Sequence, residues 1–314
     1  MKTLLIIGGT GFFGNSLLKF FLNSKILKKK FKKIIILSRS RLEKLNHLKQ
    51  LKKTYQVVKI NRDISKLKKI PYADFVIYAA ILSDFKKDYL AVKNYTRLAK
   101  VYHTNSKILY TSSGAIYGVQ KKKIKSFKED YLNSNKIIHF SSGYKKSYAK
   151  FKIKSEKLFH ELGTYGVKVS IARCFTFVGE FLPLNSNFVI GNFIKNILDK
   201  KTIVVKANYK IHRSYMYSDD LVRWLIKILN YSNTSCPIYN VGSDNKISIK
   251  KIANILSKKY HLNKIVPKSS EKFQDNYVPN INKAKKKLKL KNKYSSIQAI
   301  LKTIKLHTKN LKHQ

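Results

Sequence analysis

A glycine-rich turn near the N-terminus joins an apolar, β-prone run to a segment with helical periodicity. The run covers residues 2–7, and apolar residues recur at helical spacing over residues 12–22. The turn between them follows the spacing G-x-x-G-x-x-G. Glycine allows a tight turn and a close approach of a pyrophosphate, and the following helix N-terminus offers free N–H groups. We therefore expect a dinucleotide-binding turn, and the alternative is a plain loop. The expected contacts with the cofactor are Gly8, Thr10, Gly11, Phe12, Phe13 and Gly14.

Apolar strand-like runs alternate with longer helical stretches through the first part of the chain. The runs lie at residues 2–7, 33–38, 56–60, 74–79, 107–112 and 167–172. This alternation is typical of a doubly wound parallel sheet with helices on both faces. The sequence therefore predicts an α/β Rossmann-type fold over residues 1–175. Residues 176–314, where the rhythm loosens, are expected to form a smaller substrate-binding domain that is partly interleaved with the first.

A tyrosine and a lysine lie one helical turn apart in a helix expected over residues 147–165. Tyr148 and Lys152 share one helix face at this spacing. Tyrosine has an ordinary pKa of about 10, and we expect the nearby ammonium to lower it. Ser113, further upstream, can hold a substrate oxygen beside Tyr148. The three side chains predict hydride transfer between a nicotinamide and an alcohol or ketone, the alternative being a chance Tyr-x-x-x-Lys in a lysine-rich chain.

Further motifs accompany these residues along most of the chain. They are Asp63-Ile64, Tyr78-Ala79-Ala80, Ile116-Tyr117-Gly118, Ile171 to Phe175, Arg213 to Asp220, Tyr239 to Ser243 and Asn282-Lys283-Ala284. With them, the chain resembles the extended short-chain dehydrogenases/reductases of the NAD-dependent epimerase/dehydratase family, which act on nucleotide sugars. The resemblance runs nearly end to end.

The resemblance implies a role for each catalytic residue. Ser113 is the expected catalytic and substrate-binding hydroxyl because it stands four residues before Tyr117, and Ser112 is the neighbouring alternative. Tyr148 would exchange a proton with the sugar hydroxyl. Lys152 would lower the pKa of Tyr148 and bind the nicotinamide ribose, so both residues also count as cofactor contacts.

The resemblance also implies contacts outside the catalytic residues. Asp63 and Ile64 are expected near adenine, and Ala79 and Ala80 near the cofactor at the end of the fourth strand. Arg213 stands where the family grips the substrate diphosphate, and a guanidinium fork suits two phosphate oxygens. Asn187 is a second candidate substrate ligand, with a helix cap as the alternative.

The end of the second strand bears on the choice of cofactor. A carboxylate there usually binds the ribose 2′-hydroxyl of NAD, but this chain reads Ser38-Arg39 and has no acidic residue until Glu43. Arg39 can pair with a 2′-phosphate, for which Ser38 leaves room. We therefore expect NADP(H) in preference to NAD(H). The alternative is that Arg39 stacks on adenine or faces solvent.

Two positions depart from relatives in the family. The 4,6-dehydratases place Asp-Glu directly after the catalytic hydroxyl residue, whereas this chain has Gly114 and Ala115, which cannot transfer protons. Many relatives carry Asn where this chain has Thr176. What remains is oxidation or reduction at a sugar carbon, expected to be C4, in the synthesis of a surface polysaccharide or similar glycan. A 4-keto-6-deoxy-sugar reductase is favoured, and a 4-epimerase or a 4,6-dehydratase is the alternative.

The net charge of +50 is spread along the whole chain rather than gathered in one arm. Such a charge is typical of proteins that bind nucleic acid or anionic membranes. Only seven of the 66 basic residues are arginine, which is the better bidentate phosphate ligand. We therefore do not expect nucleic-acid binding. A non-catalytic dinucleotide- or RNA-binding relative is the distant alternative, but such proteins tend to lose the tyrosine or the lysine.

Composition sets the remaining expectations. Two cysteines, Cys174 and Cys236, are too few for a disulfide framework and favour a cytoplasmic location. No apolar run approaches the ~20 residues of a membrane helix, so no membrane association is expected, and no metal site is expected either. Homodimers that form through a pair of helices are common in the family, which makes a homodimer a candidate assembly.

Overall fold

The computed structural model describes residues 2–39, 47–81, 84–118, 125–134, 143–184, 188–268 and 270–311. The chain forms two compact units, each built from three segments. The first, which we call the sheet unit, comprises Met1–Gly118, Phe140–Cys174 and Val222–Tyr239. The second unit comprises Val119–His139, Phe175–Leu221 and Asn240–Gln314. The chain therefore passes between the units several times.

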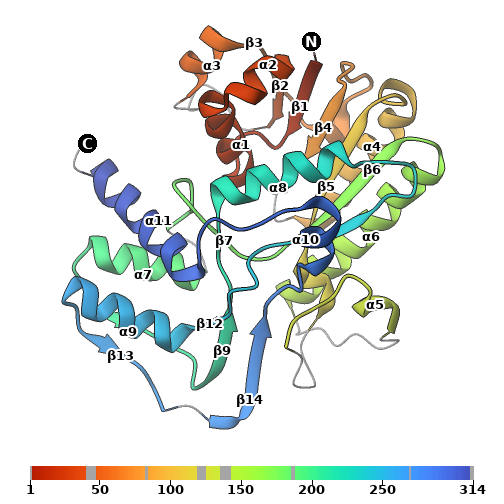
Figure 1. Ribbon diagram of the computed structural model, residues 1–314. Coiled ribbons are helices and arrows are strands. Elements are labelled where there is room, and N and C mark those ends of the chain that lie inside the picture. Colours follow the sequence, from red (N-terminus) through yellow and green to blue (C-terminus); the bar gives the residue numbers. More distant parts are fainter. Residues whose placement is uncertain are drawn as a thin grey trace. The chain divides into compact units, whose positions relative to one another are not determined.

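The sheet unit is built on a seven-stranded sheet with the order β11-β6-β5-β4-β1-β2-β3 (Figure 1). Strands β1 to β6 pair in parallel. The strands are β1 Lys2–Ile7, β2 Phe31–Ser38, β3 Gln56–Asn61, β4 Phe75–Tyr78, β5 Lys107–Ser113, β6 Lys168–Cys174 and β11 Ile238–Val241. The predicted Rossmann-type fold is confirmed. Each predicted run is a strand whose ends differ from the prediction by at most two residues.

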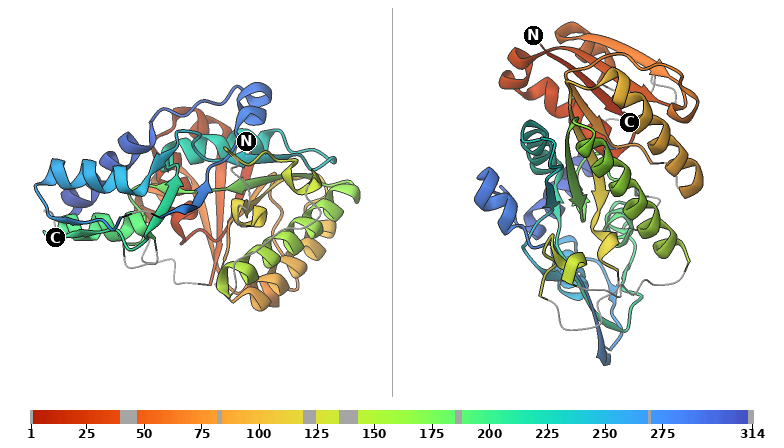
Figure 2. Two further views of the ribbon diagram at one scale, coloured as in Figure 1. Left: turned by 90° about the horizontal axis from the view of Figure 1, so that it is seen from below. Right: turned by 90° about the vertical axis from the view of Figure 1, so that its right-hand side faces the viewer.

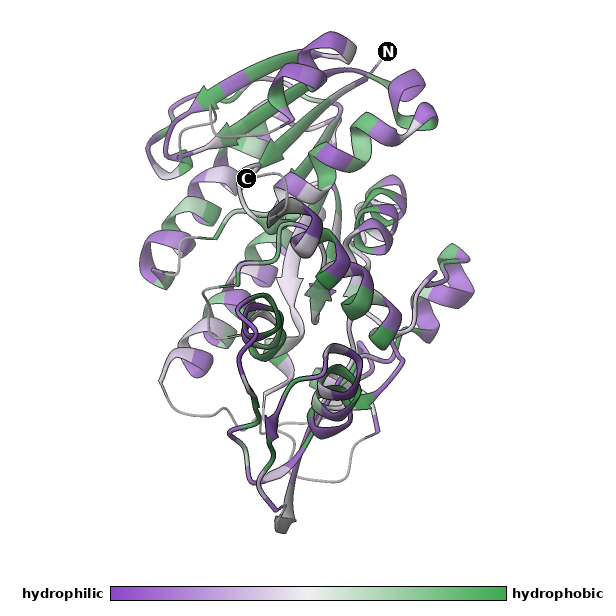
Figure 3. Cartoon of the chain, turned by 90° about the vertical axis from the view of Figure 1, so that its left-hand side faces the viewer, coloured by the Kyte–Doolittle hydropathy of each residue, from purple (hydrophilic) through white to green (hydrophobic). Residues whose placement is uncertain are grey.

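Helices cover both faces of this sheet, which is why its central strands are continuous apolar runs. The helices are α1 Phe12–Asn23, α2 Lys25–Lys30, α3 Leu48–Thr54, α4 Phe85–Tyr102, α6 Tyr144–Thr164 and α8 Ser218–Asn230. Helices α4 and α6 lie side by side on one face (Figure 2). Right-handed crossovers place α1 on the opposite face. In Figure 3 the strands of the sheet are coloured mostly hydrophobic, whereas the helices mix hydrophobic and hydrophilic residues.

An aromatic cluster packs α4 and α6 against the sheet. Tyr110 on β5 stacks on Phe159 of α6, with ring centroids 4.3 Å apart. Tyr78 on β4 meets Tyr95 of α4 at 5.2 Å. All four side chains are buried, and pairs of buried rings contribute about 0.5–1.5 kcal/mol beyond their area. The cluster fixes α6, the helix predicted to carry Tyr148 and Lys152.

The second unit contains short strands and helices around a core of its own. Its three-stranded sheet has the order β12-β9-β14, and two further strand pairs are β7 with β10 and β8 with β13. The strands are β7 Phe177–Val178, β8 Ile203–Val204, β9 Tyr209–Arg213, β10 Met216–Tyr217, β12 Ile247–Ser248, β13 Lys264–Ile265 and β14 Ser270–Tyr277. The helices are α5 Tyr131–Ser134, α7 Val189–Leu198, α9 Ile249–Tyr260, α10 Asn282–Leu288 and α11 Ser296–Leu311. Across the described residues, no helix is long and apolar enough to span a bilayer.

Two backbone turns touch where the strand order reverses between β1 and β4. Gly8 has φ +92°, and a β-carbon built on it would lie 2.6 Å from the amide nitrogen of Ala80. Gly14 is equally confined, because a β-carbon there would lie 2.3 Å from the backbone of Gly9. Glycine is therefore required at both positions. The contact holds the glycine turn against the end of β4.

Replacing Gly8 should be far more costly than replacing a glycine with open surroundings. Gly8→Ala is expected to lower the free energy of unfolding by more than about 3 kcal/mol, because it adds a clash to left-handed backbone strain. Gly166→Ala is the matched control, since Gly166 has φ +108° but a β-carbon there meets nothing within 4 Å. Strain alone should cost this control about 1 kcal/mol. Urea unfolding measures both, and equal losses would contradict the importance of the contact with Ala80.

Candidate active site

The glycine turn presents an open helix N-terminus. Gly11 is the N-cap of α1, no side chain caps the helix, and its first turn holds no acidic residue. A β-carbon at Gly11 would meet only the Gly8 carbonyl oxygen, at 3.7 Å. The first turn of α1, which begins with Phe12 and Phe13, therefore provides the electropositive helix end that favours an anion. These residues fit the pyrophosphate of a dinucleotide.

A hydroxyl pair ties this turn to the end of β2. Thr10 Oγ1 and Ser38 Oγ are 2.7 Å apart, and Asn15 Nδ2 donates to the Thr10 carbonyl at 2.8 Å. Ser38 is buried. The two residues predicted to contact the cofactor here thus brace one another.

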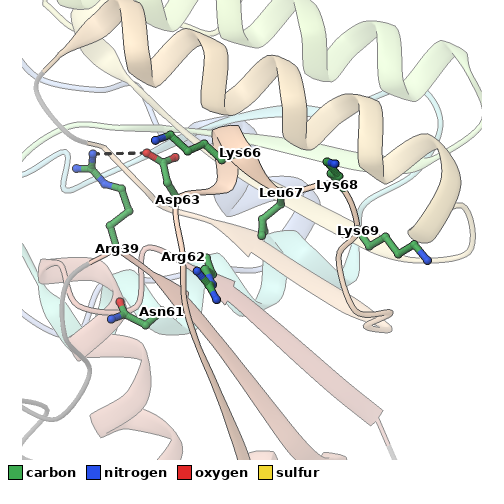
Figure 4. Close-up of a pocket in the computed structure, with 8 residues that line it drawn as sticks. All are labelled: Arg39, Asn61, Arg62, Asp63, Lys66, Leu67, Lys68 and Lys69. Carbon is green, nitrogen blue, oxygen red and sulfur yellow. Dashed lines mark ion pairs between the residues drawn. The ribbon is translucent and has the colours of Figure 1, made fainter.

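Arg39 and Asp63 face one another across a basic pocket of about 530 Å³ (Figure 4). Arg39 Nη1 lies 3.9 Å from Asp63 Oδ2. Asp63 caps the short 3₁₀ helix η2, Ile64–Lys66, by accepting the Ser65 N–H at 2.9 Å. Although burial opposes its charge, the hydrogen bonds from Ser65 and the nearby Arg39 lower the pKa of Asp63. The pocket carries five cationic side chains and one carboxylate, and its lining is Arg39, Asn61, Arg62, Asp63, Lys66, Leu67, Lys68 and Lys69.

The structure brings Ser113 and Tyr148 into contact. Ser113 ends β5, and its hydroxyl lies close enough to Tyr148 on α6 to lower the pKa of that tyrosine. The same hydroxyl accepts the N–H of Ala115 at 3.1 Å. Side chains alternate along a strand, so Ser112 points to the other face. Its buried hydroxyl has no partner among the described residues. The geometry thus favours Ser113 over Ser112.

Lys152 is buried beneath this pair. Its Nζ donates to the Thr111 carbonyl at 2.8 Å and lies 5.9 Å from the centroid of the Tyr148 ring. Burial lowers the pKa of Lys152 to about 8, while Cys174, Asp88 and Glu156 oppose the shift. The side chain is therefore cationic at neutral pH but loses its proton readily above it.

The pKa of Tyr148 moves opposite to the prediction from sequence. Burial raises it to about 12, and the hydrogen bond with Ser113 offsets only part of that effect. The expectation that Lys152 lowers the pKa of Tyr148 overall was wrong, because withdrawal from water outweighs the favourable contacts. Phe85 on α4 is one cause of the burial, since its ring centroid lies 5.6 Å from that of Tyr148.

A buried cluster adjoins the catalytic residues. Arg173 on β6 contacts Glu156 on α6 and Tyr117 of the 3₁₀ helix η3, Gly114–Tyr117. Glu156 follows Lys152 at i+4, a spacing that could have identified it.

Arg213 lies in the second unit on β9, paired with an acid that sequence reasoning missed. Its Nη2 is 2.6 Å from Asp275 Oδ2 on β14, and its Nη1 donates to the His212 carbonyl at 2.8 Å. Tyr277 lies beneath the guanidinium, at 5.8 Å. No local spacing links residues 213 and 275, so only the strand pairing reveals them. The candidate ligand Asn187 lies outside the described residues, which also contain no cluster of three metal-ligating side chains.

The fold and these residues define a class of Rossmann protein with a dinucleotide turn and a Ser-Tyr-Lys site. The sequence matches the model of the NAD dependent epimerase/dehydratase family over residues 4–242, so the chain belongs to that family. One curated relative is UDP-glucuronic acid decarboxylase 1 of Danio rerio, 26% identical over 238 residues that cover 74% of this chain and 54% of the relative. The Xenopus tropicalis protein of the same name is 30% identical over 151 residues, covering 48% and 35%. The matched region thus spans about half the length of the Danio rerio relative and about a third of the length of the Xenopus tropicalis relative.

Solved structures share the whole fold at low sequence identity. A dTDP-glucose 4,6-dehydratase from Bacillus anthracis in complex with NAD has a TM-score of 0.81 and 18% identity, with 99% of this chain and 98% of that chain covered. UDP-glucose 4-epimerase from Thermotoga maritima with UDP-glucose has a TM-score of 0.77 and 17% identity, with 98% and 99% covered. These likenesses establish the architecture over nearly the full chain.

The burial of Lys152 predicts a specific pH dependence of stability. Between pH 8 and 10.5 the folded chain loses the Lys152 proton before the unfolded chain does, so the unfolded state binds more protons and stability rises with pH. From pH 7 to 9.5, the free energy of unfolding of the wild type should rise by about 2 kcal/mol relative to that of Lys152→Met. Urea unfolding at several pH values measures the difference. Lys150→Met, at an exposed position on the same helix, is the control. Its free energy of unfolding should change with pH as that of the wild type does. A constant difference between wild type and Lys152→Met would refute the prediction.

Proposed function

We propose that this protein is a nucleotide-sugar-modifying enzyme that transfers hydride at a sugar carbon, with C4 as the reacting position. The observation that carries this proposal is the closeness of the Ser113 hydroxyl to Tyr148, next to buried Lys152, at the carboxyl edge of a Rossmann sheet. A bound nicotinamide would supply or accept the hydride. The chain's own residues would manage the proton and the orientation.

Each of the three residues has a distinct task in this proposal. Ser113 holds the sugar oxygen beside the tyrosine, so that the reacting groups meet in one geometry. Tyr148 exchanges the proton with that oxygen. Lys152 binds the nicotinamide ribose and, by its charge, favours the phenolate whenever Tyr148 must act as a base.

The ionisation of Tyr148 favours the direction of reduction. With a pKa raised to about 12, its hydroxyl is neutral at pH 7 and is ready to donate a proton to a carbonyl oxygen. Oxidation of an alcohol would first require loss of that proton. We therefore put a reductase of 4-keto-6-deoxy nucleotide sugars first.

A redox-neutral reaction is the second candidate, favoured by the names of the relatives. Epimerisation or decarboxylation would oxidise C4 and then reduce it with the same cofactor, and the matched proteins include UDP-glucuronic acid decarboxylases and a UDP-glucose 4-epimerase. A 4,6-dehydration has less support. Gly114 and Ala115 directly follow Ser113, and neither carries a group that transfers protons.

The diphosphate of the substrate is assigned to Arg213. Its side chain is one-fifth exposed, and the Asp275 carboxylate and the His212 carbonyl hold its fork in place. A guanidinium fixed in this way offers its remaining N–H groups to phosphate oxygens. The nucleotide-sugar names of the relatives support the same assignment.

NADP(H) is the proposed cofactor, in preference to NAD(H). The basic pocket beside Arg39 supports it, because Arg62 and Lys66 add positive charge where β2 and β3 end. The Arg39 side chain is 44% exposed, so its guanidinium is accessible to a 2′-phosphate. The related dehydratase structure contains NAD.

Removal of the Tyr148 hydroxyl tests the catalytic assignment. Tyr148→Phe should reduce kcat by about 10²–10⁴-fold, because proton transfer loses its donor. Tyr144→Phe is the matched control, since Tyr144 is exposed and one helical turn away on α6, and it should retain wild-type activity. The assay follows nicotinamide absorbance with a panel of UDP- and dTDP-sugars. Equal activity of both variants would contradict the assignment.

Removal of the Arg39 guanidinium tests the cofactor preference. Arg39→Ala should weaken NADPH binding about tenfold, the loss expected for one charge-assisted hydrogen bond, and leave NADH binding unchanged. Lys258→Ala, at an exposed position of α9, controls for the loss of one positive charge. Nicotinamide fluorescence titration measures the affinities of all three proteins for NADPH and NADH. Equal affinities for both dinucleotides in wild type, unaltered in Arg39→Ala, would remove the preference.

A further inference from the structure

Three buried polar side chains meet behind the catalytic residues. Arg173 Nη2 donates to Glu156 Oε2 at 2.9 Å, and its Nε lies 3.2 Å from Glu156 Oε1. Arg173 Nη1 donates to the Tyr117 hydroxyl at 3.1 Å. The guanidinium also lies 5.3 Å from the centroid of the Tyr117 ring. Arg173 and Tyr117 are 4% and 1% exposed, and Glu156 is 8% exposed.

Each member belongs to an element that carries or adjoins a catalytic residue. Glu156 lies one helical turn beyond Lys152 and two beyond Tyr148, on the same face of α6. Tyr117 ends η3, the 3₁₀ helix that Ser113 caps. Arg173 stands on β6 opposite Ser112 of β5 in the parallel ladder. One guanidinium therefore joins the helix of Tyr148 to the turn of Ser113.

We propose that the Arg173–Glu156–Tyr117 cluster is a positioning device that sets the distance between the Ser113 and Tyr148 hydroxyls. It acts through α6 and η3, and its members do not touch the reacting atoms themselves. The inference rests on the proposed function, since it assumes that this pair of hydroxyls does the chemistry.

Energetics favour a role beyond stability. A buried ion pair is on average no more stabilising than well-packed apolar residues of the same volume. The aromatic cluster and the Lys152–Thr111 hydrogen bond already dock α6 on the sheet. A bidentate guanidinium adds directional constraint, because the fork accepts a carboxylate in few orientations. Misplacement of reacting groups by about 1 Å can reduce a rate about 100-fold.

The cluster also affects the charge around Lys152. The titratable groups that face Lys152 are Tyr110 on β5, Cys174 on β6, Asp88 on α4, and Glu156 and Tyr148 on α6. Of these groups, Glu156 forms an ion pair with Arg173. Neutralising Glu156 would remove a negative charge that raises the pKa of Lys152, so Lys152 would lose its proton at a lower pH.

Graded variants test the positioning role. Tyr117→Phe removes one hydrogen bond and should lower kcat about tenfold, whereas Arg173→Lys removes the fork and should lower kcat about 100-fold. KM for the nucleotide sugar and the affinity for dinucleotide should stay within about twofold of wild type, because neither binding surface changes. Glu156→Gln should shift the pH profile of kcat for alcohol oxidation to lower pH, which a merely structural role would not do.

Tyr55→Phe is the matched control for Tyr117→Phe. Tyr55 is buried in the same unit, and its hydroxyl donates to the Phe21 carbonyl at 2.9 Å. It should lose comparable thermal stability but keep wild-type kcat. If Arg173→Lys does not fold, judged by circular dichroism, Tyr117→Phe against Tyr55→Phe decides the question.

The two levels of the proposal fail in different ways. Wild-type kcat and pH profile in the cluster variants, together with an inactive Tyr148→Phe, would overturn the positioning role alone. Full activity of Tyr148→Phe would instead overturn the proposed function. A loss of kcat no larger in Tyr117→Phe than in Tyr55→Phe would also count against the positioning role.

Discussion

A buried ammonium links the catalytic helix to the sheet. Lys152 donates to the Thr111 carbonyl at 2.8 Å, and Thr111 in turn donates from its hydroxyl to the Tyr78 carbonyl at 3.0 Å. These bonds join α6, β5 and β4 beside the Ser113–Tyr148 contact. Holding a charge away from water is costly, and the lowered pKa of Lys152 records that cost. The chain retains the charge where the proposed chemistry needs it.

Parallel strands explain why residues distant in sequence meet at one edge. Gly8 follows β1, Arg39 follows β2, Asp63 follows β3, and Ser113 ends β5. The carboxyl ends of these strands lie together, and the reversal of strand order at β1 and β4 opens the crevice where such sheets bind ligands. The same edge carries the basic pocket and the proposed proton-transfer residues. Arg173 and Glu156 fix the helix above it.

The local sequence pattern was sufficient to predict the strands and the helical spacing of Tyr148 and Lys152. It was not sufficient to predict the surroundings of each side chain. Continuous apolar runs and the i, i+4 spacing of Tyr148 and Lys152 identify their elements because these signals are local. The raised pKa of Tyr148 depends on burial by Phe85 from another helix. The Asp275 partner of Arg213 depends on the pairing of β9 with β14. Both outcomes arise from tertiary contacts that no single segment encodes.

Hydride transfer from or to C4 by this Ser-Tyr-Lys site is the central claim. The most direct test supplies protein and oxidised dinucleotide with UDP- and dTDP-sugars that carry deuterium at C4, followed by mass spectrometry of the nicotinamide after denaturation. The account predicts that deuterium appears on the nicotinamide ring with at least one sugar, and that Tyr148→Phe suppresses it. Bound nucleotide sugar with no deuterium on the nicotinamide, across the whole panel, would contradict the claim.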